Sequence, residues 1–191
     1  MASDAIEICN QALALVGGNL IQSLDDGSTE ADYCRAFYEP TVRAMIEDHP
    51  WNFAERTAVL PREATAGELD FSYSYALPSG FISVRELMNG SSRRSSQSYE
   101  IRGLSLATDE SGGQVRYTWR APEQYWPAKF AEAVTFALAS KLAMPLAEST
   151  ERADYFRSLA TNALAVARSR DSAKDSAERF DTSLLIASRY Y

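Results

Sequence analysis

Apolar side chains recur at intervals of three and four residues in four segments of the chain, and this spacing predicts four amphipathic helices. The first begins after Ser3 or Asp4, either of which can cap it, and ends at the glycines of positions 17 and 18. The second occupies most of residues 29–54. Its apolar face continues on both sides of Pro40, so we expect one bent helix that Pro50 ends.

The other two predicted helices lie in the C-terminal third of the chain. One begins near Pro122 and is expected to stop at Pro145, because proline cannot donate a helical hydrogen bond. The next begins at Ser149 or Thr150 and loses its apolar face beyond about Lys174. Alanines on both helices allow close approach, so we expect two antiparallel helix pairs that complete a four-helix bundle.

Between residues 55 and 120 the apolar period changes from helical to alternating, which predicts strands. Residues 71–77 alternate apolar with small side chains, and residues 57–60, 81–88, 99–102, 104–107 and 114–119 predict further short strands. No helical segment interrupts them, so we expect an antiparallel meander. Residues 91–98, which include Arg93 and Arg94, lack an apolar anchor and predict an exposed loop.

The predicted fold class is therefore α+β: a four-helix bundle with an inserted small antiparallel β-sheet domain and an extended C-terminal tail. The first two helices fall in residues 1–54, the β domain in 55–120, the other two helices in 121–174 and the tail in 175–191. Trp51 and Phe53 directly follow the helix stop at Pro50. We expect these three residues to form the structural junction between helix and sheet.

The last 17 residues carry apolar side chains but have no partner element of their own (191 − 174 = 17). Extended at ~3.3 Å per residue, they reach on the order of 55 Å, which is far enough to cross to another subunit. The alternative is that they fold back on their own bundle. The apolar side chains in question are Phe180, Leu184, Leu185, Ile186, Tyr190 and Tyr191.

The composition fits a folded domain of 191 residues, with 46% hydrophobic and 24% charged residues. The net charge of −7 argues against a protein that binds nucleic acid through its phosphates, although a channel through which DNA slides would benefit from not attracting it.

We expect no signal peptide and no membrane-spanning segment. Cys9 and Cys34 lie on apolar helix faces and are expected to be buried thiols rather than a disulfide.

The sequence has few residues in patterns that indicate catalysis. The single histidine, His49, precedes a proline at a helix stop and is better explained as structural. Nucleotide-binding, zinc and serine-hydrolase motifs are absent, so we expect no cofactor and no metal. Adjacent acids at positions 25–26, 47–48 and 109–110 leave open a hydrolase with two carboxylates, because glycoside hydrolysis can use two acids alone.

Several stretches, taken in order, resemble the tail tubular protein A family, the head-to-tail adaptors of short-tailed bacteriophages. They are an N-terminal helix with ICNQALALVGG, a long helix ending in DHPWNFA, strands with YALPSGFISVREL and YEIRGLSLAT, and two alanine-rich C-terminal helices followed by a loose tail. The resemblance covers nearly the whole chain. The combination of His49, Pro50 and Trp51 with the later Leu77-Pro78 pair is its most distinctive part.

The resemblance implies a structural adaptor, not an enzyme, that forms a ring of about twelve copies in the tail or neck of the virion after assembly in the host cytoplasm. The ring would join the portal protein to the tail nozzle or next tail protein, and double-stranded DNA would pass through it without sequence-specific binding. The C-terminal apolar residues at 180–191 would contact the portal and neighbouring subunits. Arg93 and Arg94 would lie in a loop that meets the next tail component. A cell-wall-degrading hydrolase remains the alternative.

Overall fold

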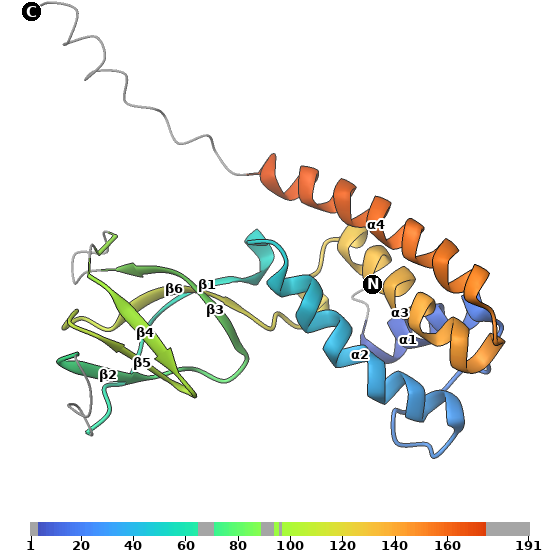
Figure 1. The fold of residues 1–191 in the computed structure, drawn as a ribbon, viewed down its shortest axis with the longest axis horizontal. Helices are drawn as coiled ribbons and strands as arrows, with labels where there is room; N and C mark the ends of the chain where they lie inside the picture. Colours follow the sequence, from blue (N-terminus) through green and yellow to red (C-terminus); the bar gives the residue numbers. More distant parts are fainter. Residues whose placement is uncertain (1–3, 65–70, 89–93, 96, 175–191) are drawn as a thin grey trace, which may run out of the picture.

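The computed structural model describes residues 4–64, 71–88, 94–95 and 97–174, and it has four α-helices and two antiparallel sheets within them. The helices lie on one side of the molecule and the strands on the other (Figure 1). The predicted α+β class is therefore confirmed. The helices are α1 (Ala5–Val16), α2 (Thr29–Glu47), α3 (Ala128–Ala147) and α4 (Thr150–Ser172). The strands are β1 (Glu55–Val59), β2 (Tyr73–Ala76), β3 (Phe81–Met88), β4 (Tyr99–Arg102), β5 (Ser105–Thr108) and β6 (Gln114–Trp119).

Side chains just before three of the helices satisfy the first free backbone N–H groups, and Asp4 is one of the two caps that the sequence predicted for the first helix. The Asp4 carboxylate accepts a hydrogen bond from the Glu7 N–H at 2.7 Å and caps α1. The hydroxyls of Ser28 and Ser149 cap α2 and α4 in the same way. Gly17 ends α1 with a φ of 82°, a left-handed conformation that favours glycine.

Two prolines of the described chain lie inside helices, Pro40 in α2 and Pro145 in α3. Pro40 lies inside α2, which is one helix as expected. The predicted stop at Pro145 was wrong, because α3 continues to Ala147 and ends where Glu148 adopts a φ of 48°. A proline in the last turn removes only one hydrogen bond there. The start of α3 is also later than Pro122, since a short 3-10 turn at Glu123–Tyr125 comes first.

Helix α3 is the centre of the helical part, and α1, α2 and α4 each pack against it. Helix α4 packs chiefly on α3, so the four helices cluster around one member; the closed four-helix bundle is not confirmed. Helix α3 alone, among the described residues, is long and apolar enough to cross a membrane, and 44% of its apolar window is buried in the protein. The largest fully buried side chains of this core include Trp51, Phe130, Ile8, Leu13, Ile46, Leu138 and Leu142.

The strands form two three-stranded sheets rather than the single meander that the sequence predicted. The order is β1-β6-β3 in one sheet and β2-β5-β4 in the other, and every pairing is antiparallel. The meander was wrong because β1 and β3 both pair with β6, far along the chain. Among the described strands, β4 and β5 alone are consecutive in the chain and paired with each other.

Side chains from both sheets share a second, smaller core. Tyr75 of β2 and Leu106 of β5 pack there with Leu87 of β3 and Val115 of β6. The sheets approach closely at Gly113, where a Cβ atom would lie 2.4 Å from the Tyr75 ring and φ is 57°. Only glycine fits at this position without a shift of the ring.

Cys9 and Cys34 are buried free thiols between α1 and α2, as predicted. The neighbouring Cys34 side chain, together with burial, raises the pKa of Cys9. Their role in the fold is that of small apolar side chains that let α1 and α2 approach each other.

Candidate functional site

The junction between the helices and the sheets holds the predicted residues Pro50, Trp51 and Phe53. Pro50 is exposed, whereas the Trp51 side chain is fully buried, and its indole N–H donates to the Met45 carbonyl at 2.9 Å. The Trp51 ring lies 4.9 Å from the Phe130 ring and 5.6 Å from Phe53, measured between centroids. Both aromatic side chains therefore pack into the helical core on α3, while the backbone at residue 51 leads toward β1.

The direct link from this point to the sheets is Arg85 of β3, a residue that the sequence analysis missed. Its guanidinium donates to the Trp51 carbonyl at 2.6 Å, to the Glu55 carboxylate at 2.8 Å and to the Thr118 hydroxyl at 2.9 Å. Burial lowers the pKa of Arg85, and Glu55 opposes that shift. One side chain thus joins β3, β1 and β6 to the end of α2. An arginine within the mostly apolar strand 81–88, next to Glu86, was the signal in the sequence.

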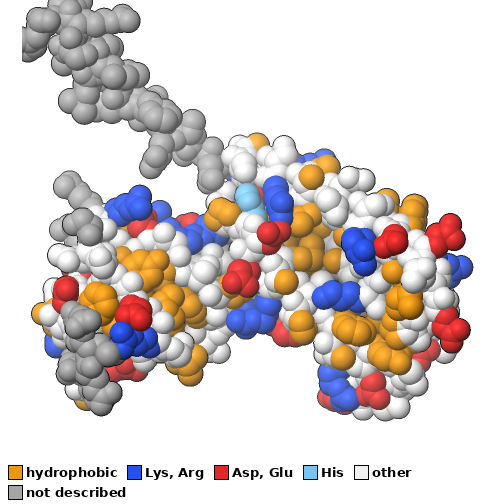
Figure 2. Space-filling model, viewed as in Figure 1, with side chains coloured by type: hydrophobic (Ala, Val, Ile, Leu, Met, Phe, Trp, Pro, Cys, Tyr) orange, Lys and Arg blue, Asp and Glu red, His pale blue; other side chains and the backbone are white. Residues whose placement is uncertain are grey.

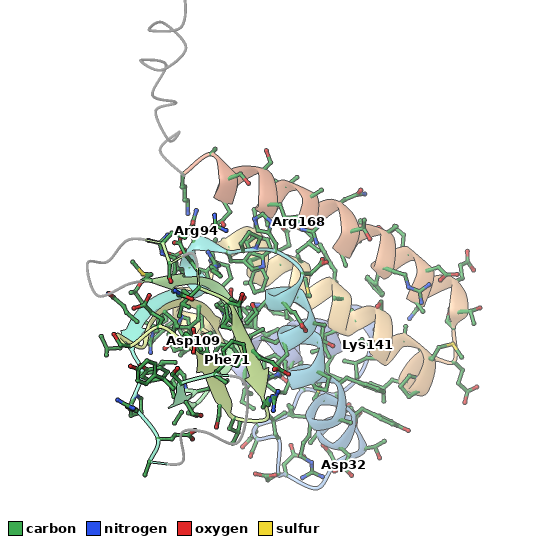
Figure 3. All side chains as sticks on the ribbon, turned by 60° about the vertical axis from the view of Figure 1, so that its left-hand side comes forward. Asp32, Phe71, Arg94, Asp109, Lys141 and Arg168 are labelled. Atoms are coloured by element: carbon green, nitrogen blue, oxygen red, sulfur yellow. The ribbon has the colours of Figure 1, made fainter. Side chains whose placement is uncertain are left out.

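A buried carboxylate on α4 closes the junction from the other side. Asp171, only 3% exposed, accepts the Asn52 backbone N–H at 2.9 Å, and the Asn52 amide donates to the Asp171 carbonyl at 3.1 Å. The His49 Nε2 atom lies 3.8 Å from the same carboxylate. Arg168 of α4, labelled in Figure 3, pairs with Asp48 at the end of α2. The C-terminal end of α4 is therefore held to the segment that follows α2.

The electrostatics favour a neutral His49. Burial lowers the pKa of His49, the nearby guanidinium of Arg168 lowers it further, and the Asp171 carboxylate opposes them without reversing the shift. Beside it, a surface hollow of about 340 Å³ is lined by His49, Arg85 and Glu47, among others. The imidazole contacts a single buried carboxylate and the Trp51 ring, at 4.6 Å between centroids. These contacts join the end of α2 to α4, which favours a structural role for His49, as expected for a lone histidine.

The chain returns from the sheets to the helices through a second polar contact. Arg120, which follows β6, donates to the Glu39 carboxylate of α2 at 3.1 and 3.0 Å and to Glu123 at 2.7 Å. The Tyr38 hydroxyl donates to Glu123 at 2.8 Å. Burial alone would raise the pKa of Glu123, but the hydrogen bond from Arg120 leaves it lowered. Both connections between the two parts of the molecule are thus fixed by an arginine.

One acid of each pair considered for hydrolysis makes contacts that support the fold. Asp48 pairs with Arg168. Asp26 accepts from the backbone and hydroxyl of Ser28 within a turn, and Asp109 accepts from those of Ser72, which is 37 residues away in the chain. Hydrogen bonds from these serines lower the pKa of both acids. Within the described ranges, no group of three or more His, Cys, Asp or Glu side chains is placed to hold a metal ion.

Two other sets of predicted residues can be placed only in part. Arg94 is exposed on the β part of the molecule (Figure 3), with its Nε atom 3.9 Å from a Glu86 carboxylate oxygen. Arg93 lies outside the described residues. The apolar C-terminal residues Phe180, Leu184, Leu185, Ile186, Tyr190 and Tyr191 also lie outside them.

No protein-family model matches the chain, and no curated protein matches it. The candidate site is therefore defined by the structure alone. The helical part and the β part are joined by the contacts of Arg85 and Arg120, and apolar side chains gather on the surface of both parts (Figure 2).

Proposed function

We propose that this protein is a structural head-to-tail adaptor of a bacteriophage virion, which joins the portal to the tail as a ring of about twelve copies. The observation that carries the proposal is the order of sequence features shared with the tail tubular protein A family. Two N-terminal helices, an inserted β part that begins after Trp51, two alanine-rich helices and an apolar C-terminal segment follow one another. DNA would pass through the ring without sequence-specific contacts.

In this proposal the two parts of the subunit have different tasks. The four helices would act as a bundle in the wall of the ring, and residues 175–191 would form the extended segment that reaches the portal and neighbouring subunits. The sheets would face the next tail protein, with Arg93 and Arg94 in the docking loop. The rigid junction around Arg85 supports this division, because a fixed angle between helices and sheets would let every copy present the same surfaces.

Deletion of residues 176–191 tests the proposal. The shortened protein should keep its far-UV circular dichroism and unfold at a similar temperature, since the described residues have their own cores, but it should no longer bind purified portal particles. As a control, Arg94→Ala should leave portal binding intact, because that residue is assigned to the opposite docking surface. Unchanged portal binding by the deletion variant would refute the assignment.

The isolated subunit should be a monomer in sedimentation velocity runs, because the net charge of −7 opposes self-association without the portal. A stable ring at low protein concentration would contradict this. The hydrolase alternative is tested on purified cell wall: release of soluble fragments that stops when acids at 25–26, 47–48 or 109–110 are replaced, in variants that still fold, would favour an enzyme.

A further inference from the structure

A largely apolar groove of about 590 Å³ lies between α1 and α3 on the surface of the helical part, and its lining also includes Gln11, Glu132 and Thr135. Small side chains line much of it, among them Ala14 of α1 and Ala128 and Ala131 of α3, and small side chains allow another backbone to approach closely. Leu15 at its edge is 40% exposed, and Phe136 also lines it. An apolar surface of this kind is stabilised when another apolar segment covers it.

The described chain ends beside this groove. Lys174, the last described residue, lines a second cavity of about 240 Å³ together with Ala128 at the start of α3. Ala128 also lines the groove. Because α4 brings its C-terminal end to the N-terminal end of α3, the residues that follow Lys174 begin at one end of the groove.

The remaining 17 residues (191 − 174 = 17) are long enough to reach along the groove. Phe180, Leu184, Ala187 and Tyr191 are spaced by four, three and four residues, a pattern that would place them on one side if the segment were a helix. Seventeen residues span about 25 Å as a helix at ~1.5 Å per residue. The lining part of α3, residues 128–136, spans only about 12 Å by the same rise.

Charge favours the same placement. Arg170 and Lys174 line the second cavity, where the N-terminal end of α3 adds partial positive charge. Lys129 adds a third cation to the lining, which also includes the carboxylate of Asp171. The segment begins with Asp175 and Glu178, ahead of Arg179, so its first four residues carry two acids where the cavity lining has a net positive charge.

We propose that residues 175–191 occupy the α1/α3 groove of their own chain in the free subunit. The contact covers the groove and keeps the side chains of Phe180, Leu184, Ala187 and Tyr191 out of water. This inference goes beyond the adaptor function and does not require it. A second copy of the chain and a different protein are the competing occupants.

Disulfide trapping in the full-length chain tests the proposal. Leu15→Cys places a thiol at the groove and Leu184→Cys places one in the segment, while Cys9 and Cys34 stay buried. With oxidised glutathione, the double variant should form an intramolecular disulfide whose yield does not change over a hundredfold dilution. The matched control pairs Leu184→Cys with Leu104→Cys, which is 82% exposed beside the β4–β5 hairpin, and should react at least tenfold more slowly.

Three outcomes decide between the occupants. Fast intramolecular trapping of the Leu15 pair alone supports the proposal, and Ala131→Arg, or Ala128→Arg if the first variant unfolds, should slow it about tenfold. Disulfide-linked dimers whose yield falls on dilution would assign the groove to a second copy and overturn the proposal. Equal rates for the groove pair and the control pair would overturn it as well. Portal binding is a separate measurement, so failure here leaves the adaptor function untouched.

Discussion

Replacement of Trp51 by alanine should be one of the most damaging single changes in the molecule. The side chain is fully buried, its ring contacts Phe130, Phe53 and His49, and its N–H satisfies the Met45 carbonyl in the last turn of α2. A fully buried tryptophan removes roughly 200 Å² or more of surface from water, and its truncation to alanine typically costs ~3–5 kcal/mol. We therefore expect Trp51→Ala to lower the free energy of unfolding by about 4 kcal/mol.

Urea unfolding followed by far-UV circular dichroism measures this loss. A domain is commonly stable by ~5–15 kcal/mol, so the variant should still fold at low urea, with an earlier midpoint. Trp51→Phe distinguishes the contribution of the ring from that of the hydrogen bond. It keeps an aromatic side chain but leaves the Met45 carbonyl unpaired, and it should lower the free energy of unfolding by about 1–3 kcal/mol. Tyr125→Ala is the control, because its ring is 52% exposed and should cost less than ~1 kcal/mol.

A loss below ~1 kcal/mol for Trp51→Ala, with an unchanged dependence on urea, would refute the reasoning. It would mean that the ring adds little to the core, despite its contacts with Phe130 and the end of α2. A loss equal to that of Tyr125→Ala would carry the same meaning.

Three further changes probe the polar contacts of the junction. Arg85→Met should cost about 1–3 kcal/mol in urea unfolding, because it removes the charged hydrogen bonds to the Trp51 carbonyl and to Glu55; a loss under ~0.5 kcal/mol would contradict this. Asp171→Ala should cost about 1–3 kcal/mol by removing the acceptor of the Asn52 N–H, whereas Asp171→Asn, which keeps an oxygen, should cost less. The pKa of His49 is lowered in the fold, so the stability linked to it is present above about pH 6.5 and is lost as the pH falls below that value. His49→Gln should therefore lose less stability than the wild type between about pH 7 and pH 5, and parallel stability curves for the two proteins would show that His49 is not responsible.

Local patterns predicted the elements because each depends on neighbouring residues. Strands β3, β4 and β6 lie where their alternation of side chains indicated, and Asp4, Ser28 and Ser149 cap helices as their side-chain chemistry predicts. Strand pairing was not predictable in this way. Residues 55–59 pair with 114–118, and nothing within either segment specifies a partner so far along the chain.

The candidate site shows the same limit. Trp51 was identifiable because it follows a helix stop, but its indole points into the helical core, and Arg85 makes the contact with the sheets. An arginine beside a glutamate in a short strand looks like an ordinary outward-facing residue. Arg85 is important because it bonds to the Trp51 carbonyl, Glu55 and Thr118 at once. These three groups are far from Arg85 in the sequence, and the tertiary fold brings them together.

The pairing of β1 with β6 gives the molecule a modular connection. Glu55, where the chain enters the sheets, lies directly opposite Thr118, near where it leaves them. Partners across an antiparallel pair are about 5 Å apart, so a short loop could replace the whole excursion from 55 to 118 without separating α2 from α3. The sheets could thus be exchanged for another insert during evolution, or by design, while the surrounding helices keep their packing. The Arg85 contact with the Trp51 carbonyl would have to be rebuilt with every exchange, whereas Arg120 and Glu39 lie outside residues 55–118 and would keep their contact.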